Sequence, residues 1–129
     1  MFVLDTDICV YALRANAAVI HHLRQHSPDE VAVTVVTEAE LEYGVLKSRE
    51  PSRNRTAVAH LLRPLARLPF DSDAAAHHAA IRFALRSAPI GERDTIIASI
   101  AVAKGATLVS NNEAEFKRVP GLHLENWLR

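Results

Sequence analysis

The chain has 129 residues, the length of one ordinary domain, and we expect residues 1–129 to form a single domain. Apolar residues make up 49% of it and charged residues 23%, a balance that excludes a disordered or fibrous chain. The 15 basic and 15 acidic residues cancel, so a nucleic-acid footprint, if the fold has one, must be local.

Cysteine content and hydropathy narrow the class of protein further. Cys9 is the one cysteine, which excludes an internal disulfide bond and a Cys-rich zinc site. The longest charge-free apolar run, Thr95–Ala103, is much shorter than the roughly 20 residues of a membrane-spanning helix. Asp5 follows the first apolar residues too early for a signal peptide. We therefore expect a cytoplasmic protein with no membrane association.

The first half of the chain alternates between strand and helix patterns. Short apolar and helical-period segments predict a strand at 2–4, a helical pattern at 8–12 and a helix at 17–26. The β-branched run Val31–Val36 is typical of a strand buried on both faces of a parallel sheet. Thr37 is then expected to cap a helix over 38–49, with Glu40 completing a T-x-x-E capping box.

The second half continues this alternation after a predicted break at residues 50–54. The expected elements are helices at 55–65, 71–88 and 93–104, an edge segment at 68–70, and strands at 107–109 and 122–124. Gly105 is expected to end the last of these helices. Strands alternating with helices predict an α/β fold, in which a parallel sheet is covered by helices on both faces. Its binding crevice would lie at the carboxyl ends of the strands.

Polar residues follow three of the predicted strands, at Asp5, at Thr37–Glu42 and at Ser110–Asn112, and Asp94 lies in the first turn of an apolar helix. If they converge, their carboxylates repel one another unless a cation offsets the charge. Mg²⁺ and Mn²⁺ prefer such hard oxygen ligands and activate water against a phosphodiester. The alternative is that each acid only caps its own helix.

Helical geometry separates the three acids that follow the second strand. At about 100° per residue, Glu38 and Glu42 share one face, whereas Glu40 points roughly 160° away from both. Gly44 lies on the face of Glu40, where close packing or access explains an interior glycine. We favour Glu40 as the acid that faces the crevice, and the capping-box interpretation remains open.

Four ordered blocks, which span nearly the whole chain, resemble those of PIN-domain ribonucleases. They are Leu4–Cys9 (L-D-T-N/D-x), Thr37–Gly44 (T-x-x-E-L-x-x-G), Gly91–Ala98 (D-x-x-I-A) and Leu108–Phe116 (T-N-D/N-x-x-x-F). Pro120–Leu122 and Glu125–Trp127 complete the likeness. Each block alone is a weak motif, but their order makes the set specific. Within that family the chain most resembles the VapC toxins of bacterial type II toxin–antitoxin modules.

The resemblance implies a PIN-like α/β/α sandwich with a short, mostly parallel sheet. It also implies a homodimeric endoribonuclease, a hydrolase that depends on Mg²⁺ or Mn²⁺, with transfer RNA as the substrate class to test first. A VapB-type antitoxin would neutralise it, and operator DNA would be bound only through that antitoxin.

By position, Asp5, Glu40 and Asp94 match the family's acidic residues, and we predict them as catalytic residues and metal ligands. Asp5 and Asp94 would hold the metal directly, with Glu40 as a ligand or as the group that orients and deprotonates the attacking water. The fourth family acid falls on Asn112, an amide that adds no charge. Glu115, one helical turn beyond, would supply the missing carboxylate through water.

Substrate contacts would come from polar and basic side chains near these acids. Thr6 and Ser110 would bind phosphate or water. The densest basic stretch contains Lys47, Arg49, Arg53 and Arg55, and phosphate contacts of this kind are salt-sensitive and blind to sequence. A solvated charged loop is the alternative for this stretch.

Two other functions compete with the nuclease. Asp5-Thr6-Asp7 after a strand mimics the D-x-D motif of aspartyl phosphatases, although Asn111-Asn112 do not provide the later acidic pair which that class needs. A catalytically silent binding module would use Asn112 in place of an acid. Zinc binding by His22 and His26 is not favoured, because no acid lies at a suitable offset. Cys9 is expected to fill the core.

Overall fold

The structure is a computed structural model that describes residues 1–129. Five parallel strands form one sheet in the order β3-β2-β1-β4-β5. The strands are short: β1 (Phe2–Leu4), β2 (Val31–Thr34), β3 (Ala66–Leu68), β4 (Thr107–Val109) and β5 (His123–Glu125). The sheet is therefore wholly parallel, and its central strands β1, β2 and β4 are the ones that carry the polar ends noted in the sequence.

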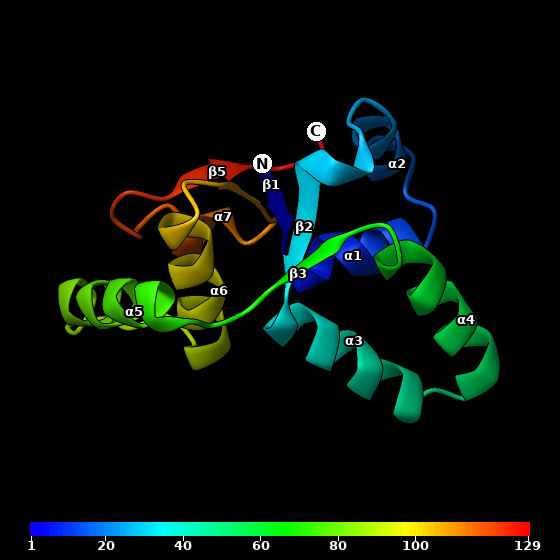
Figure 1. The fold of residues 1–129 in the computed structure, drawn as a ribbon, viewed down its shortest axis with the longest axis horizontal. Helices are drawn as coiled ribbons and strands as arrows, with labels where there is room; N and C mark the ends of the chain where they lie inside the picture. The colour runs from blue at the N-terminus through cyan, green and yellow to red at the C-terminus, as the bar shows by residue number, and fades with distance from the viewer.

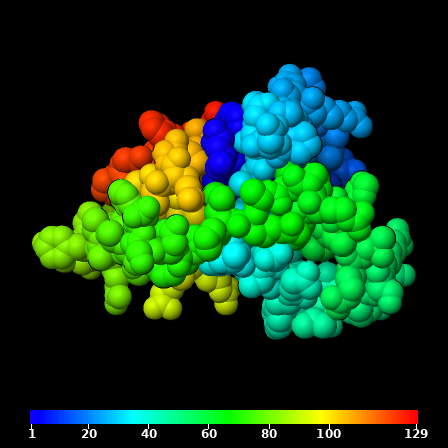
Figure 2. Space-filling view, viewed as in Figure 1, coloured from blue at the N-terminus to red at the C-terminus, as the bar shows by residue number.

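Helices cover both faces of this sheet (Figure 1). One layer contains α1 (Thr6–Leu13), α2 (Ala17–Arg24), α3 (Val35–Leu46) and α4 (Pro51–Leu62). The other contains α5 (Ser72–Ala84), α6 (Glu92–Ala103) and α7 (Glu113–Phe116), and a 3₁₀ turn at Pro28–Glu30 precedes β2. In the space-filling view α5 forms the projecting end of the molecule (Figure 2). This arrangement confirms the predicted α/β/α sandwich.

Two apolar cores lie on opposite faces of the sheet. Val3 packs with Ile97 and Phe116 on the α5–α7 side, whereas its neighbour Leu4 packs with Ile8 on the α1–α4 side. Successive strand residues point to opposite faces, so even a three-residue strand supplies both cores. Cys9 is buried in the second core with a free thiol, which confirms its expected role.

The start of α3 differs from the prediction. The strand ends at Thr34, and Val35 and Val36 already belong to the helix. Thr34 is the N-cap, because its hydroxyl accepts a hydrogen bond from the Thr37 amide at 3.2 Å. The predicted Thr37 cap and its capping box with Glu40 are therefore wrong. A β-branched run cannot show where a buried strand becomes a buried helix, because both are apolar throughout.

Other boundaries shift for local reasons. Pro51 begins α4 and does not break the chain, since the first helical position needs no amide hydrogen. The edge strand β3 ends at Leu68, one residue before Pro69, and α5 ends at Ala84. Gly105 adopts a φ of +61° directly after α6, as expected of a residue that ends a helix. None of the helices has the length and apolar character needed to cross a bilayer.

Candidate active site

Asp5 lies at the end of the central strand β1 and caps α1. Its Oδ1 accepts a hydrogen bond from the Thr6 amide at 2.8 Å, and its Oδ2 accepts one from Ser110 Oγ at 2.8 Å. The side chain is buried. Burial, together with the smaller effect of the nearby charge of Asp7, raises the pKa of Asp5 from 3.8 to about 7. Asp5 is thus a buried carboxyl group whose ionised form needs a positive partner.

Asp7 is a second acid of this site, and the sequence reasoning did not include it among the site residues. Its Oδ2 accepts a hydrogen bond from the Asn111 amide at 3.0 Å. Its Oδ1 is enclosed and has no hydrogen-bond partner. Burial raises the pKa of Asp7 as well. The signal is present in the sequence, where Asp7 occupies the N/D position of the Leu4–Cys9 block.

Asp94 reaches the same region from the first turn of α6. Asn112 donates from Nδ2 to Asp94 Oδ2 at 3.4 Å, so the amide that replaces the family's fourth acid contacts one of the other three. Burial raises the pKa of Asp94 most, and the negative charges of Glu115 and Glu40 also raise it. Glu115 therefore lies close enough to Asp94 for its charge to act on the site.

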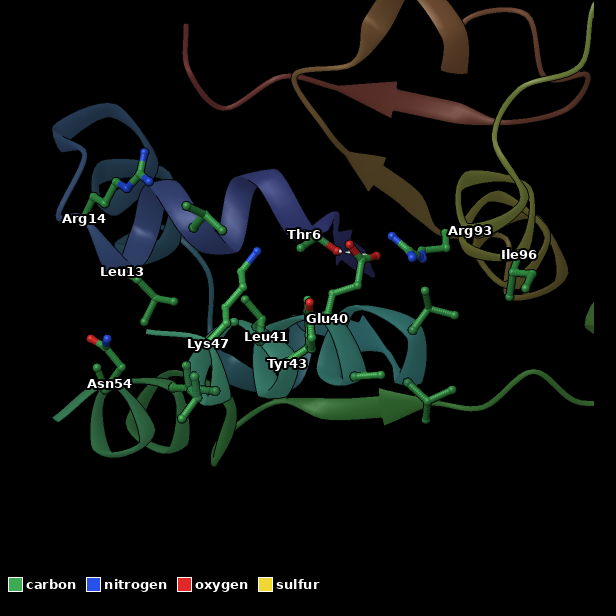
Figure 3. A pocket seen from close by; sticks show the side chains of 18 residues that line it. Thr6, Leu13, Arg14, Glu40, Leu41, Tyr43, Lys47, Asn54, Arg93 and Ile96 are labelled. Carbon is green, nitrogen blue, oxygen red and sulfur yellow. Dashed lines mark hydrogen bonds between the residues drawn. The ribbon is translucent and has the colours of Figure 1, made fainter. Parts of the chain in front are cut away.

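Glu40 completes the constellation from α3. Thr6 Oγ1 donates to Glu40 Oε1 at 3.3 Å, which joins α1 to α3 beside the aspartates (Figure 3). The other two acids of this helix point elsewhere: Glu38 forms an ion pair with Arg67 at 3.1 Å and Glu42 one with Arg55 at 3.4 Å. The geometric separation predicted from the helical period is confirmed. The structure thus brings Asp5, Glu40 and Asp94 together with Asp7.

The donor set suits a hard divalent cation. These acids supply only oxygen donors, they repel one another, and Asp7 Oδ1 lacks a partner. No group of three or more His, Cys, Asp or Glu side chains is placed to hold a metal ion by itself. Mg²⁺ is commonly bound by one or two carboxylates and several water molecules, so an open set of this kind fits it.

A groove of about 1030 Å³ extends from this acidic cluster between α1, α3 and α4. Thr6, Glu40 and Arg93 line one end, and Lys47 and Asn54 line the other (Figure 3). Gly44 opens onto it: a Cβ atom added there would meet nothing within 4 Å, so access explains this glycine and close packing does not.

The basic stretch predicted to contact substrate is divided by the structure. Arg53 pairs with Glu50 and Arg55 with Glu42, so both are partly neutralised. Lys47 lines the groove, with its ammonium 5.1 Å from the centre of the Tyr43 ring. Arg14 and Arg93, which the sequence reasoning did not single out, line the same groove and form no ion pair.

Comparisons with known proteins agree with this geometry. Residues 2–122 match the PIN domain family. The chain is 36% identical to ribonuclease VapC2 of Rickettsia felis, with 98% of both chains covered. It is 34% identical to the tRNA(fMet)-specific endonuclease VapC of Salmonella typhimurium, over 98% of this chain and 97% of the relative.

Solved structures give the same result. VapBC2 from Rickettsia felis, bound to a DNA fragment from its promoter, superposes with a TM-score of 0.90 at 36% identity, and 98% of each chain is covered. DNA-bound VapBC from Salmonella typhimurium superposes with a TM-score of 0.92 at 32% identity, over 98% of this chain and 97% of that one. PIN-domain ribonucleases depend in general on divalent metal. Sequence blocks, fold and acidic cluster agree, and the chain belongs to the PIN-domain family as a VapC-type endoribonuclease of the toxin–antitoxin class.

Proposed function

We propose that this endoribonuclease cleaves transfer RNA at the cluster formed by Asp5, Glu40 and Asp94, within one PIN domain over residues 1–129. The observation that carries the assignment is the convergence of these acids, from β1, α3 and α6, beside a groove that basic side chains line. Transfer RNA is proposed because the Salmonella relative is named for it. We therefore also propose that it acts in the cytoplasm, where transfer RNA is found.

Asp5 and Asp94, together with the unpartnered oxygen of Asp7, would hold the divalent metal, which we propose to be Mg²⁺ or Mn²⁺. When bound, the metal supplies charge neutralisation and lowers the pKa of water. Burial and, to a smaller extent, mutual repulsion raise the pKa values of the aspartates, and with their charge offset they would stay ionised near neutral pH.

Side chains of the protein would position the attacking water and accept its proton. Glu40 is the free carboxylate that would accept a proton from the attacking water, and Thr6 Oγ1 fixes its orientation. Asn112 and Glu115 border Asp94 and would position water there. Arg93 and Lys47, at opposite ends of the groove, would bind phosphates of the RNA strand. Attack by water, with no participation of the ribose 2′-hydroxyl, leaves a 5′-phosphate and a 3′-hydroxyl.

We further propose that a VapB-type antitoxin neutralises the enzyme by occupying this groove. The solved relatives include VapBC complexes from Rickettsia felis and Salmonella typhimurium. The groove offers apolar side chains as well as charged ones, among them Val10, Leu13 and Tyr43, and Tyr43 is 64% exposed. A free protein would leave that surface in water, which favours a covering partner. The active assembly is proposed to be a homodimer that reaches operator DNA only through the antitoxin.

Cleavage of total tRNA by the antitoxin-free protein tests the proposal. Reactions with Mg²⁺ or Mn²⁺ and with EDTA would compare the wild type with Asp5→Asn and Asp94→Asn. We expect cleavage that requires metal and both aspartates, and products with 5′-phosphate ends. Cleavage by both variants at the wild-type rate would show that the site is misplaced. A folded, metal-bound wild type that cuts no RNA would instead support a silent binding module.

A further inference from the structure

The loop between β4 and α7 contacts all three aspartates of the proposed site. Ser110 Oγ donates to Asp5 at 2.8 Å, the Asn111 amide donates to Asp7 at 3.0 Å, and Asn112 Nδ2 donates to Asp94 at 3.4 Å. Three consecutive residues thus supply one hydrogen bond each to three acids that come from two different helices and a strand end. The loop therefore joins Asp94 of α6 to the two aspartates at the start of α1.

The loop is held from its other side by the C-terminal segment, residues 125–129. The Ser110 amide donates to the Glu125 carbonyl at 3.0 Å. Asn126 Nδ2 donates to Asn111 Oδ1 at 3.0 Å and to Glu113 Oε2 at 3.1 Å. The Asn126 carbonyl oxygen of the side chain accepts from the Leu128 amide at 3.0 Å, so all the polar atoms of this side chain are engaged. Asn126 is therefore a fixed bridge between the C-terminal segment and the loop.

Trp127 anchors the segment next to this bridge. Its side chain is 1% exposed and stacks against two imidazole rings, that of His22 in α2 at 5.3 Å and that of His26 just after α2 at 5.4 Å, with interplanar angles of 10° and 7°. Trp127 Nε1 donates to Glu125 Oε1 at 3.1 Å. The histidine pair that we considered for zinc therefore holds the C-terminal tail, which ends beside α2 (Figure 1).

We infer that Asn126 is a positioning residue for the metal site, acting through Asn111 on the loop that holds Asp5, Asp7 and Asp94. The inference rests on the proposed function, because it takes these acids as the metal ligands. Asn126 makes no hydrogen bond to any of the acids of the proposed site. Partners that orient metal ligands from outside typically change affinity about 10- to 100-fold when removed, and Asn126 acts one bond further away, so an effect of about 3- to 10-fold is expected.

Mn²⁺ binding measured by titration calorimetry on the full-length, antitoxin-free protein tests the inference without relying on activity. We expect Asn126→Ala to weaken Mn²⁺ binding about 3- to 10-fold and Asn111→Ala, which removes the other end of the same bond, to weaken it similarly. Because both act through one bond, the double variant should bind no more weakly than the worse single variant. Arg129→Ala is the matched control, since Arg129 contacts Glu113 from the same segment without touching Asn111.

Four results would overturn the inference. Unchanged Mn²⁺ affinity in a folded Asn126→Ala protein would show a merely structural residue, and so would effects of the two single variants that multiply in the double variant. Weakening by Arg129→Ala equal to that by Asn126→Ala would show a general effect of the tail. If Asn126→Ala does not fold, the Mn²⁺ affinity of Asn111→Ala tests the inference by itself, because the Asn111 side chain is exposed and its removal should not unfold the protein. A wild type that binds no Mn²⁺ overturns the proposed site as well, whereas normal wild-type binding confines the failure to this inference.

Discussion

At the residue scale, three acids of one helix have three different environments. Glu38 and Glu42 form ion pairs at the surface, whereas Glu40 accepts a hydrogen bond from Thr6 beside the buried aspartates. The difference follows from the helical period alone, because residues two positions apart on a helix face away from each other. Glu40 is thus the one free carboxylate of α3 that can accept a proton at the site.

Replacing Glu40 should abolish most of the activity without unfolding the protein. We expect Glu40→Gln to lower kcat for tRNA cleavage about 100- to 10,000-fold, the range for loss of a general base. Glu42→Gln, one turn before the end of the same helix and away from the groove, should retain the wild-type rate. Rate assays on both variants under saturating metal check this, and equal losses in the two would contradict the assigned role.

The buried carboxyl of Asp5 predicts a pH-dependent stability for the metal-free protein. Its pKa is about 7 when folded and 3.8 in the reference state, so between these values the folded protein retains a proton that the unfolded chain has released. The free energy of unfolding in EDTA should therefore fall as pH rises from about 4 to 7, by at most about 4 kcal/mol.

Urea denaturation across that pH range, for wild type and Asp5→Asn, measures this dependence. The variant cannot ionise at residue 5 and should show a flatter profile, and saturating Mg²⁺ should flatten that of the wild type by stabilising the carboxylate. Asp73→Asn, which alters an exposed carboxylate of α5, is the control. If the stability of Asp5→Asn changes with pH in the same way as that of the wild type, Asp5 does not hold a proton in the folded protein.

At the scale of the elements, short polar side chains decide where helices begin. Thr34 caps α3 from the last position of β2, which moves the helix three residues earlier than the sequence pattern predicted. Asp71 caps α5 by accepting a hydrogen bond from the Ala74 amide at 3.0 Å. Helix α5 buries only Ala74 and Ile81, so its stability depends more on its cap than that of the deeply packed α6 does.

Removing the α5 cap should have a measurable cost. Asp71→Ala is expected to lower the free energy of unfolding by about 1 kcal/mol, and Asp71→Asn, which keeps the accepting oxygen, by only a few tenths. Asp73→Ala removes an acid from the same first turn that makes no capping bond and should cost less than Asp71→Ala. Thermal denaturation of the three variants measures these losses of stability. Equal losses for Asp71→Ala and Asp71→Asn would refute the capping role.

At the scale of the whole molecule, the C-terminal end of the chain packs against its N-terminal end. Trp127 belongs to the core that also contains Leu4 and Ile8, and its ring packs against Phe2 at 5.5 Å as well as against the histidines at positions 22 and 26. The C-terminal segment therefore stabilises the α1–α4 layer while it holds the loop above the acids. Both the stability of the fold and the geometry of the site therefore depend on this segment.

Truncating Trp127 should destabilise the whole protein. We expect Trp127→Ala to cost about 3–5 kcal/mol, because it empties a fully buried site. Trp127→Phe keeps an aromatic ring against the histidines and should cost markedly less, although it loses the Nε1 donor. Leu128→Ala, at a half-buried neighbouring position, is the matched control. Denaturant titration measures all three, and a loss for Trp127→Ala no larger than that for Leu128→Ala would rule out an anchoring role.

The sequence alone was sufficient for the order of strands and helices, the α/β/α class and the family. Alternation of short apolar strands with helical periods is a local property, and the four motif blocks are read directly along the chain. The direction of Glu40 also followed from local geometry. Boundaries were less certain where one composition suits two structures: Val35 and Val36 fit a buried strand and a buried helix equally well, and Pro51 either breaks a chain or begins a helix.

Only the tertiary structure showed how the site is held. Asp7, the division of the basic stretch into paired and free side chains, and the link from Trp127 through Asn126 to the loop at Asn111 all depend on contacts between distant parts of the chain. Asn126 lies 15 residues from Asn111, and the bonded pair Asp7 and Asn111 is separated by 104. No periodicity or local propensity encodes such pairs, because packing of the two helical layers against the sheet brings them together.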